Sequence, residues 1–318
     1  MSIRLVIGCL LALLLCPLVL GQQKSVNDVS ARDEVLQRIA AGEETARKAE
    51  SAHADNLALG RIYAQLGLWY EDAGLWNRAE ADMEHAISLL RHASEPVDDL
   101  ATVLDKLGSM HVSMGKLGDS EKEEQEALRL RERSGDKLQI ARSWNDLAAL
   151  SLAQKKYPKA KEFAERATTE LLANSRAEAI DRISSRYTLS LALCYVKACV
   201  SALPMLKDAL EEAKATMRPT DLPVGFGTFL LGYVYWKSGD TVKAGEYMER
   251  GKSIMGEHLG WQHPTYLGAS RAYARYLRDN SRVEDAEVVE RQIRQAETTV
   301  DVKTLQTQKG ALGFGQSR

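Results

Sequence analysis

Between Leu66 and Ile87 the sequence is LGLWYEDAGLWNRAEADMEHAI, and this stretch contains the pattern that decides the fold. A large apolar residue followed by a small one, Leu66-Gly67, comes before an aromatic residue, Tyr70, and a glycine, Gly74. The pattern returns five more times along the 318-residue chain, at a period of 40 to 42 residues. Its leading residues recur as Leu107-Gly108, Leu147-Ala148, Leu189, Leu231-Gly232 and Tyr273-Ala274. A fixed period of this length indicates a repeat architecture.

Each copy of the pattern predicts a pair of antiparallel helices. The apolar, small and aromatic residues lie on one stripe of the first helix, and the small residue lets a second helix approach closely. In the clearest copies Gly74, Gly115 and Gly239 mark the end of the first helix, because the left-handed conformation that ends a helix favours glycine. No single pair can bury its apolar stripe alone, so neighbouring pairs are expected to stack into a solenoid.

These residues are similar to the consensus positions of the tetratricopeptide repeat (TPR) family, and the resemblance covers residues 56 to 297. The period exceeds the family's usual length of about 34 residues. Together with Trp144-Asn145-Asp146-Leu147-Ala148 and His263-Pro264, the longer unit resembles the repeats of kinesin light chains and many bacterial TPR proteins. The resemblance implies an all-α, right-handed α-solenoid of about six helical hairpins with an N-terminal capping helix.

The pattern divides the chain into four segments. We expect a signal peptide over residues 1–21, a loose segment and the capping helix over 22–55, the solenoid over 56–297, and a flexible tail over 298–318. The amphipathic stretch from Asp33 to His53 is the expected cap. The six hairpins are expected near residues 60–93, 101–134, 141–174, 183–216, 225–258 and 267–297.

The first 21 residues are typical of a secretory signal. Arg4 precedes an uncharged, mostly apolar run from Leu5 to Leu20, and cleavage is expected after Gly21. The alternative is an uncleaved membrane anchor, although the run is short for a membrane span. We expect an exported protein, periplasmic or secreted, and the absence of any Asn-x-Ser/Thr site favours a bacterial envelope. No later stretch of sequence is long and apolar enough to cross a bilayer.

Two cysteines remain after the expected cleavage, Cys194 and Cys199, and both fall in the fourth hairpin. An exported protein can hold a disulfide, but this spacing within a helical hairpin need not bring the two sulfur atoms into bonding geometry. We therefore expect two small buried residues in preference to a disulfide. The sequence has no Cys-x-x-Cys motif and no Cys/His cluster, so we predict no metal site.

Neither the composition nor the motifs point to nucleic-acid binding or catalysis. The formal net charge is −2 at pH 7, so nucleic acid is not the expected partner. The sequence has no zinc-protease histidine pair, no Gly-x-Ser-x-Gly elbow, no phosphate-binding glycine loop and no dinucleotide fingerprint. Asp72 and Asp105 are the only acidic residues that approach a paired acid and base. We predict a protein that is not an enzyme and needs no cofactor.

The fifth hairpin carries a second apolar stripe beside the repeat consensus. Phe226, Phe229, Tyr233 and Trp236 recur at helical spacing on its first helix. The resemblance to TPR proteins implies that first helices line a concave groove. It places matching residues of the fourth and sixth hairpins in the same groove: Tyr187, Leu191, Tyr195, Arg271, Arg275 and Arg278. Aromatic anchors beside arginines suit a peptide that has apolar side chains next to acidic ones.

The second stripe also has three alternative roles. It can pack against a neighbouring helix, because a helix that is apolar all round is usually buried. It can form a dimer contact, or the chain's own tail can fold into the groove through Leu312 and Phe314. The favoured function is an exported, non-catalytic scaffold or adaptor that binds a protein or peptide segment. The alternative is a self-associating structural subunit of an envelope complex, and an enzyme built on helices is the least favoured class.

Overall fold

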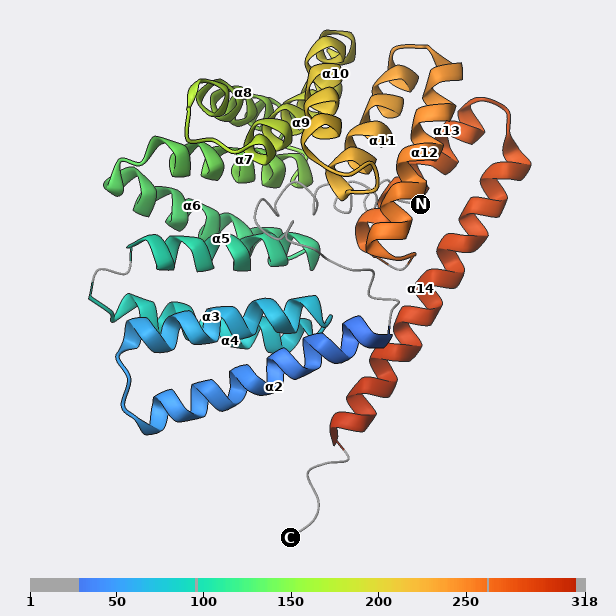
Figure 1. Cartoon of the computed structure of the whole chain (residues 1–318). Helices are drawn as coiled ribbons and strands as arrows, with labels where there is room; N and C mark the ends of the chain where they lie inside the picture. Colours follow the sequence, from blue (N-terminus) through green and yellow to red (C-terminus); the bar gives the residue numbers. More distant parts are fainter. Residues whose placement is uncertain (1–28, 95–96, 262, 313–318) are drawn as a thin grey trace.

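The computed structural model describes residues 29–94, 97–261 and 263–312, and within these ranges the chain forms thirteen α-helices and no strand. This arrangement confirms the predicted all-α solenoid. None of the described helices combines the length and the apolar character that a membrane span requires. The helices, labelled in Figure 1, are α2 (Val29–Ser51), α3 (Asn56–Asp72), α4 (Trp76–Arg91), α5 (Val97–Ser113), α6 (Leu117–Ser134), α7 (Lys137–Ala153), α8 (Tyr157–Ala173), α9 (Ala179–Tyr195), α10 (Cys199–Thr216), α11 (Leu222–Lys237), α12 (Thr241–Leu259), α13 (Pro264–Asp279) and α14 (Val283–Leu312).

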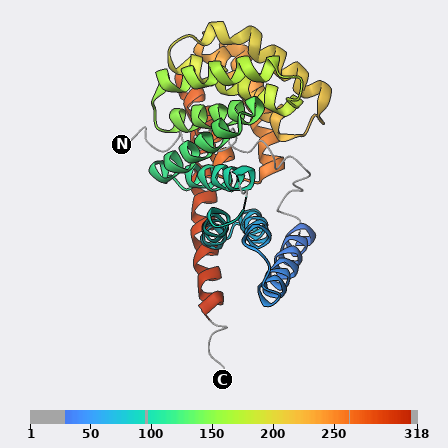
Figure 2. The ribbon, with the colours of Figure 1, turned by 90° about the vertical axis from the view of Figure 1, so that its left-hand side faces the viewer.

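From α3 onward, successive helices pack as pairs, and each second helix also contacts the first helix of the next pair. The pairs follow one another along an arc, and α2 packs against α3 at the N-terminal end (Figure 1, Figure 2). Ile39 and Ala46 of α2 are buried there, as expected of a capping helix. The first helices begin close to the predicted period, at Asn56, Val97, Lys137, Ala179, Leu222 and Pro264.

One residue with a positive φ angle stands in the tight turn inside each pair. Gly74, Gly115 and Gly239 have φ angles of 72°, 77° and 93°. The left-handed conformation at these three positions ends the first helix, as the sequence predicts. In the other pairs the same place is taken by Lys155, Lys197 and Ser281. The turn geometry therefore repeats more regularly along the chain than the glycine does.

The apolar core consists of two main clusters and two small ones. The first main cluster extends from Ile39 in α2 to Ala127 in α6, and the second extends from Val112 in α5 to Ile293 in α14. The two main clusters meet around α5 and α6. The buried stripe of α6 is largely polar at this place, since it contains Glu124 and Arg131.

The two ends of the chain differ from the prediction. Helix α14 continues to Leu312, whereas the last helix of the solenoid was expected to end near Glu297. The stretch from Thr298 to Leu312 contains no proline and a single glycine, Gly310, so little in it ends a helix. Helix α2 begins at Val29, within the segment expected to be loose. The expected signal peptide and Phe314 lie outside the described residues.

Cys194 and Cys199 form a disulfide, which corrects the expectation of two unbonded cysteines. Cys194 belongs to the last turn of α9, and Cys199 is the first residue of α10. Lys197, with a φ angle of 65°, reverses the chain between them. The two Cα atoms lie 4.0 Å apart as a result. The spacing in the sequence did not indicate this, because it carries no information about how tightly the turn folds back.

Candidate binding surface of the first helices

The first helices of successive pairs form the inner layer of the arc. Helix α5 contacts α7, α7 contacts α9, and α9 contacts α11, whereas the second helices mainly contact the first helices on either side of them. Elements on the inside of a bend lie closer together than elements on the outside, so these contacts identify the first helices as the concave layer. The predicted groove residues belong to α9, α11 and α13 of this layer.

Four of the ten predicted groove residues are buried in the core. Tyr187 and Leu191 of α9 are 2% and 1% exposed, and Phe226 and Phe229 of α11 are 3% and 0% exposed. The rings of Tyr187 and Phe226 lie with their centroids 5.8 Å apart. Because α9 and α11 are in direct contact, these side chains fill the space between the two helices. The prediction that these four residues face a ligand is therefore corrected.

The remaining aromatic residues gather at the C-terminal ends of α9 and α11. Tyr195, Tyr233 and Trp236 are each half-buried. Tyr157, at the start of α8, stacks on Tyr195 with ring centroids 4.6 Å apart and ring planes 5° apart. Burial raises the pKa of the Tyr195 hydroxyl and the neighbouring Tyr233 adds to this shift, while the ring of Tyr233 lies 5.7 Å from that of Trp236. We call Tyr157, Tyr195, Tyr233 and Trp236 the aromatic edge.

Two cationic side chains flank the aromatic edge. Lys237 Nζ lies 3.2 Å from the ring centroid of Trp236, a cation–π contact. Burial lowers the pKa of Lys237. Burial raises the pKa of the Tyr233 hydroxyl, and the positive charge of the exposed Arg275 opposes this shift. The surface thus combines flat apolar rings with neighbouring positive charge, which suits a ligand with both apolar and acidic groups.

Helix α14 engages the other two predicted arginines. Arg278 donates from Nε and Nη2 to the two carboxylate oxygens of Glu290, at 2.9 and 2.8 Å. Arg271 forms an ion pair with Glu297. Because the second helix of the same hairpin supplies these acidic partners, the sixth pair offers a ligand less positive charge than the sequence indicates.

Tyr157 and Lys237 were not predicted from the sequence. Tyr157 precedes the fourth hairpin and opens a second helix, so the pattern of first helices did not include it. The sequence feature that could have identified Tyr157 is an aromatic residue at the first position of a second helix, next to the turn. Lys237 directly follows Trp236 in the sequence, and its position beside a predicted anchor was the signal for it.

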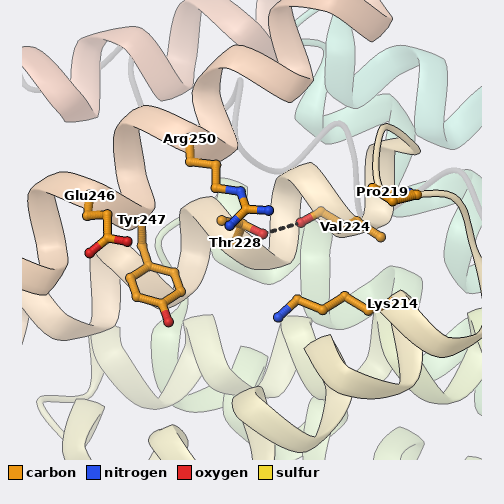
Figure 3. A pocket seen from close by; sticks show the side chains of 7 residues that line it. All are labelled: Lys214, Pro219, Val224, Thr228, Glu246, Tyr247 and Arg250. Atoms are coloured by element: carbon orange, nitrogen blue, oxygen red, sulfur yellow. Dashed lines mark hydrogen bonds between the residues drawn. The ribbon is translucent and has the colours of Figure 1, made fainter.

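A separate pocket of ≈ 250 Å³ lies between α10, α11 and α12 (Figure 3). Lys214 of α10 and Arg250 of α12 extend into it from different helices, and Thr228 donates a hydrogen bond to the Val224 carbonyl at 2.7 Å on the α11 side. Lys214 is also paired with Glu211 at 2.8 Å. The pocket is lined by Lys214, Pro219, Val224, Thr228, Glu246, Tyr247 and Arg250. None of the predicted site residues lines this pocket.

Three carboxyl groups meet in the interior, away from both surfaces. Asp105 of α5, Glu124 of α6 and Asp146 of α7 place carboxylate oxygens within 4.8 Å of one another. Oxygen donors are what hard cations such as Mg²⁺ and Ca²⁺ prefer, but the guanidinium group of Arg131, paired with Asp105, already places a positive charge at this cluster. Asp105 was considered from the sequence as one member of a possible acid–base pair. The repeat pattern did not indicate that Asp105, Glu124 and Asp146 lie together.

Two family models match the chain, and both describe a tetratricopeptide repeat. One covers residues 59–97 and the other covers residues 99–169, which together correspond to most of α3 to α8. Most of the aromatic edge lies beyond the matched residues, on α9 and α11. No curated protein sequence matches the chain.

Several solved structures share the fold. The apo form of RapI is 13% identical, with a TM-score of 0.71 over 85% of this chain and 94% of that one. A Rap protein complexed with Competence and Sporulation Factor is 14% identical, with a TM-score of 0.60 over 88% and 89% of the two chains. BtubC (BKLC) from P. vanneervenii is 17% identical, with a TM-score of 0.54 over 71% and 92%. At these identities the likeness concerns the fold alone.

Proposed function

Because the chain is a tetratricopeptide repeat protein, we propose that it is a non-catalytic scaffold or adaptor that binds a protein or peptide segment on its concave layer. The aromatic edge carries this proposal. Together with Arg275 it draws on four consecutive helix pairs, from Tyr157 in α8 to Arg275 in α13. A segment of chain that lies across the C-terminal ends of α9 and α11, between the start of α8 and α13, can contact these residues together.

The chemistry of the surface indicates a segment with apolar side chains next to acidic ones. Large aromatic rings contribute much of the affinity at protein interfaces, because they bury area at a low cost in conformational entropy. The guanidinium group of Arg275 can hold a carboxylate through two hydrogen bonds. Burial lowers the pKa of Lys237, so a carboxylate of the bound segment placed beside this ammonium group would stabilise its charge.

A binding role has support from a structure of similar fold. The Rap protein that resembles this chain was solved in a complex with Competence and Sporulation Factor. A solenoid of this shape is therefore able to hold a partner. The inner layer of such a solenoid offers an extended surface, since each pair adds one helix to it.

The proposal extends to an exported protein. The N-terminal pattern of Arg4 followed by an apolar run supports this location. The disulfide between Cys194 and Cys199 also supports it, because structural disulfides persist in oxidising compartments outside the cytoplasm. Cell fractionation with a tag at the C-terminus tests the location, and recovery of the whole pool with the cytoplasm would contradict it.

The alternative function, a self-associating structural subunit, rests on different side chains. Val200 and Val242 are 66% and 82% exposed, each at the second position of a second helix. These two positions follow the turns at which α9 and α11 end, and they offer an apolar contact that does not include the aromatic side chains. Sedimentation at increasing protein concentration separates the two functions. A stable dimer that Val200→Ser/Val242→Ser dissociates would favour the structural subunit.

Binding to a peptide array tests the scaffold proposal. The array contains peptides in which apolar residues flank Asp or Glu, together with matched peptides that carry Lys at the same positions. We expect wild-type protein to bind the acidic set. Trp236→Ala/Arg275→Glu should weaken this binding about tenfold or more, which is typical of losing an aromatic anchor and a charge partner.

The matched control is Trp261→Ala/Arg291→Glu, which makes the same two changes at exposed positions outside the aromatic edge. This variant should bind the acidic peptides as the wild type does. Equal binding by the edge variant and the wild type, or a preference for the Lys peptides, would overturn the assignment of the surface.

A further inference from the structure

The second helix of the second pair differs from the other second helices in its buried stripe. In α4, α8, α10 and α12 the buried positions are mainly alanine, leucine and methionine. In α6 they are Ser120, Glu124, Ala127 and Arg131. Two ionisable side chains thus occupy positions at which the neighbouring pairs bury apolar groups. Such a substitution in a core is costly unless the charges are satisfied.

Glu124 occupies the place of a methionine. It lies against Gly108 of its first helix, and a Cβ atom on that glycine would fall 2.8 Å from Glu124 Oε1. The exposed fraction of Glu124 is 0%. The equivalent contacts in the first and fifth pairs are Met83 on Gly67 and Met248 on Gly232. The carboxyl group of Glu124 is therefore enclosed where two other pairs place a thioether.

Asp105 and Asp146 approach Glu124 from α5 and α7, with carboxylate oxygens within 4.8 Å of one another. Arg131 forms an ion pair with Asp105 and donates from Nη1 to Ser143 Oγ at 2.6 Å. Both oxygens of Glu124 are buried and have no hydrogen-bond partner, and the same holds for Oδ1 of Asp105 and Oδ1 of Asp146. Buried polar atoms are nearly always paired, so these oxygens point to a ligand that lies among them.

The charges around this cluster do not balance. Lys106 of α5 and Arg142, one turn before Asp146 on α7, place positive charge near Asp146, while Glu123 of α6 adds a negative charge near Glu124. Arg142 is committed to Asp181, to which it donates from Nε and Nη2 at 2.9 and 2.8 Å. Three carboxyl groups thus face one directly paired guanidinium. If all three were ionised, the interior would hold uncompensated negative charge, which is strongly unfavourable.

We propose that Asp105, Glu124 and Asp146 form a buried proton-binding site at the joint between the second and third helix pairs, and that loss of the proton loosens this joint. A protonated carboxyl group donates its O–H to a neighbouring carboxylate, so one proton satisfies two of the unpaired oxygens. A proton is favoured over a metal ion because Arg131 already places a positive charge against Asp105, and that charge repels a cation.

The position of the site in the fold gives it a mechanical consequence. The two main apolar clusters of the core meet around α5 and α6, where the carboxyl groups interrupt the buried stripe. In a solenoid each pair is held mainly by its neighbours, so the strength of one joint governs how firmly the two sides are connected. Helices α2 to α6 are thus connected to the remaining helices through a joint that responds to protons.

The direction of the pH response follows from burial. Burial raises the pKa of Asp105, Glu124 and Asp146, and the negative charge of Asp105 raises the pKa values of the other two further. A carboxyl group whose pKa is raised by folding stabilises the folded state fully below its unfolded pKa. That stability is lost as the pH rises through the folded pKa. The joint is therefore firm in acid and weaker as the pH rises.

Two variants of Glu124 test the proposal by thermal unfolding between pH 5.5 and pH 8.5. Glu124→Gln cannot ionise but keeps a donor, and Glu124→Met restores the residue that the first and fifth pairs use. At pH 8.5 both variants should unfold at a higher temperature than the wild type. In each variant, the number of protons taken up on folding should be smaller than in the wild type by up to about one proton. Because glutamine and methionine differ in polarity, one variant protein remains informative if the other fails to fold.

The matched control is Glu132→Gln, which makes the same change at an exposed position of α6 and should keep the wild-type pH dependence. Hydrogen exchange, corrected for its intrinsic pH dependence, should show weaker protection of α5 to α7 at pH 8.5 than at pH 5.5 in the wild type and in Glu132→Gln, but not in the two Glu124 variants. Wild-type pH dependence in both Glu124 variants would overturn the proposal. Stabilisation of the wild type by Ca²⁺ or Mg²⁺ at pH 8.5, abolished in Glu124→Gln, would also overturn it, since it would assign a metal ion to the site.

Discussion

His111 is nearly enclosed, with 4% of its side chain exposed, and each of its ring nitrogens lies against a carboxylate. Nδ1 is 2.8 Å from an oxygen of Glu123 on α6, and Nε2 is 2.9 Å from an oxygen of Glu80 on α4. Only a protonated imidazole donates from both nitrogens. Burial acts against this charge, but the hydrogen bonds to Glu123 and Glu80 outweigh it and raise the pKa of His111. One side chain therefore joins three consecutive helices.

Replacing His111 with glutamine should destabilise the protein most in acid. The charged hydrogen bonds are present below the ordinary histidine pKa and are lost as the pH rises through the raised pKa of the folded state. We expect a loss of about 1 to 3 kcal/mol at pH 6 and a smaller loss at pH 9. Urea unfolding at the two pH values measures the difference, and equal losses would contradict this role.

Lys155 holds the left-handed turn position that glycine holds in three other pairs, with a φ angle of 62°. An L side chain in this conformation carries a steric cost that glycine lacks. Lys155→Gly should therefore stabilise the protein by about 1 kcal/mol, and Gly115→Ala at the same place in the second pair should destabilise it by a similar amount. Chemical denaturation measures both changes. A loss of stability in Lys155→Gly would show that the lysine side chain contributes more than its backbone strain costs.

The sequence predicted the identity of many site residues but not their exposure. Spacing on one helix placed Phe229 and Tyr233 on the same stripe, yet Phe229 is 0% exposed and Tyr233 is half-buried. The difference arises from the neighbouring helix α9, which covers the middle of α11 and leaves its C-terminal end accessible. Contacts between helices that are about forty residues apart in sequence are set by the superhelix. Periodicity within one helix carries no information about them.

At the level of elements, the turn between α9 and α10 combines a disulfide with part of the binding surface. Cys194 and Cys199 are bonded, and Tyr195 lies between them in sequence and stacks on Tyr157. The disulfide fixes the end of α9 against the start of α10. It therefore also fixes the position of Tyr195 in the aromatic edge.

Cys194→Ser/Cys199→Ser should destabilise the protein by about 2 kcal/mol, because the closed loop is short and constrains the unfolded chain only moderately. It should also weaken binding of the acidic peptides, since Tyr195 gains freedom. Denaturation in the presence and absence of a reductant checks the first effect, and the variant itself should not respond to the reductant. A double variant as stable as the wild type would show that α9 and α10 hold the turn without the bond.

The repeat pattern predicted the helices better than the features between and beyond them. The six leading residues, from Leu66 to Tyr273, lie inside the six first helices. The disulfide and the length of α14 were not predicted, because each depends on local geometry that the repeat consensus does not contain. The carboxyl cluster was missed for a related reason: Asp105, Glu124 and Asp146 come from three helices. Only the fold brings them together.

At the scale of the whole molecule, the solenoid gives the chain one continuous inner layer and a core in two main clusters. The aromatic edge lies on α8, α9 and α11, on the C-terminal side of the joint between the second and third helix pairs. Each pair contacts chiefly its neighbours, so changes at the joint should reach the edge only through α7 and α8. Binding at the edge and the pH response of the joint are therefore separable properties.

Salt should weaken peptide binding without abolishing it. Arg275 is exposed, so its attraction for a carboxylate is screened as the ionic strength rises. The aromatic contacts are not screened. We expect the affinity of the wild type to fall between 0.05 and 0.5 M salt by a factor of about ten or less, and that of Arg275→Gln to change less. Titration calorimetry at the two salt concentrations measures both, and an affinity that rises with salt in the wild type would exclude the charge contact.

Contact mapping tests the central claim, that the aromatic edge is the binding surface. A photo-crosslinking residue is placed at position 236 in one protein and at position 261 in another, and each is irradiated with the tightest-binding acidic peptide. We predict that the peptide is captured from position 236 and not from position 261, and that an excess of unlabelled peptide prevents the capture. Capture from position 261 alone, or equal capture from both positions, would contradict the account.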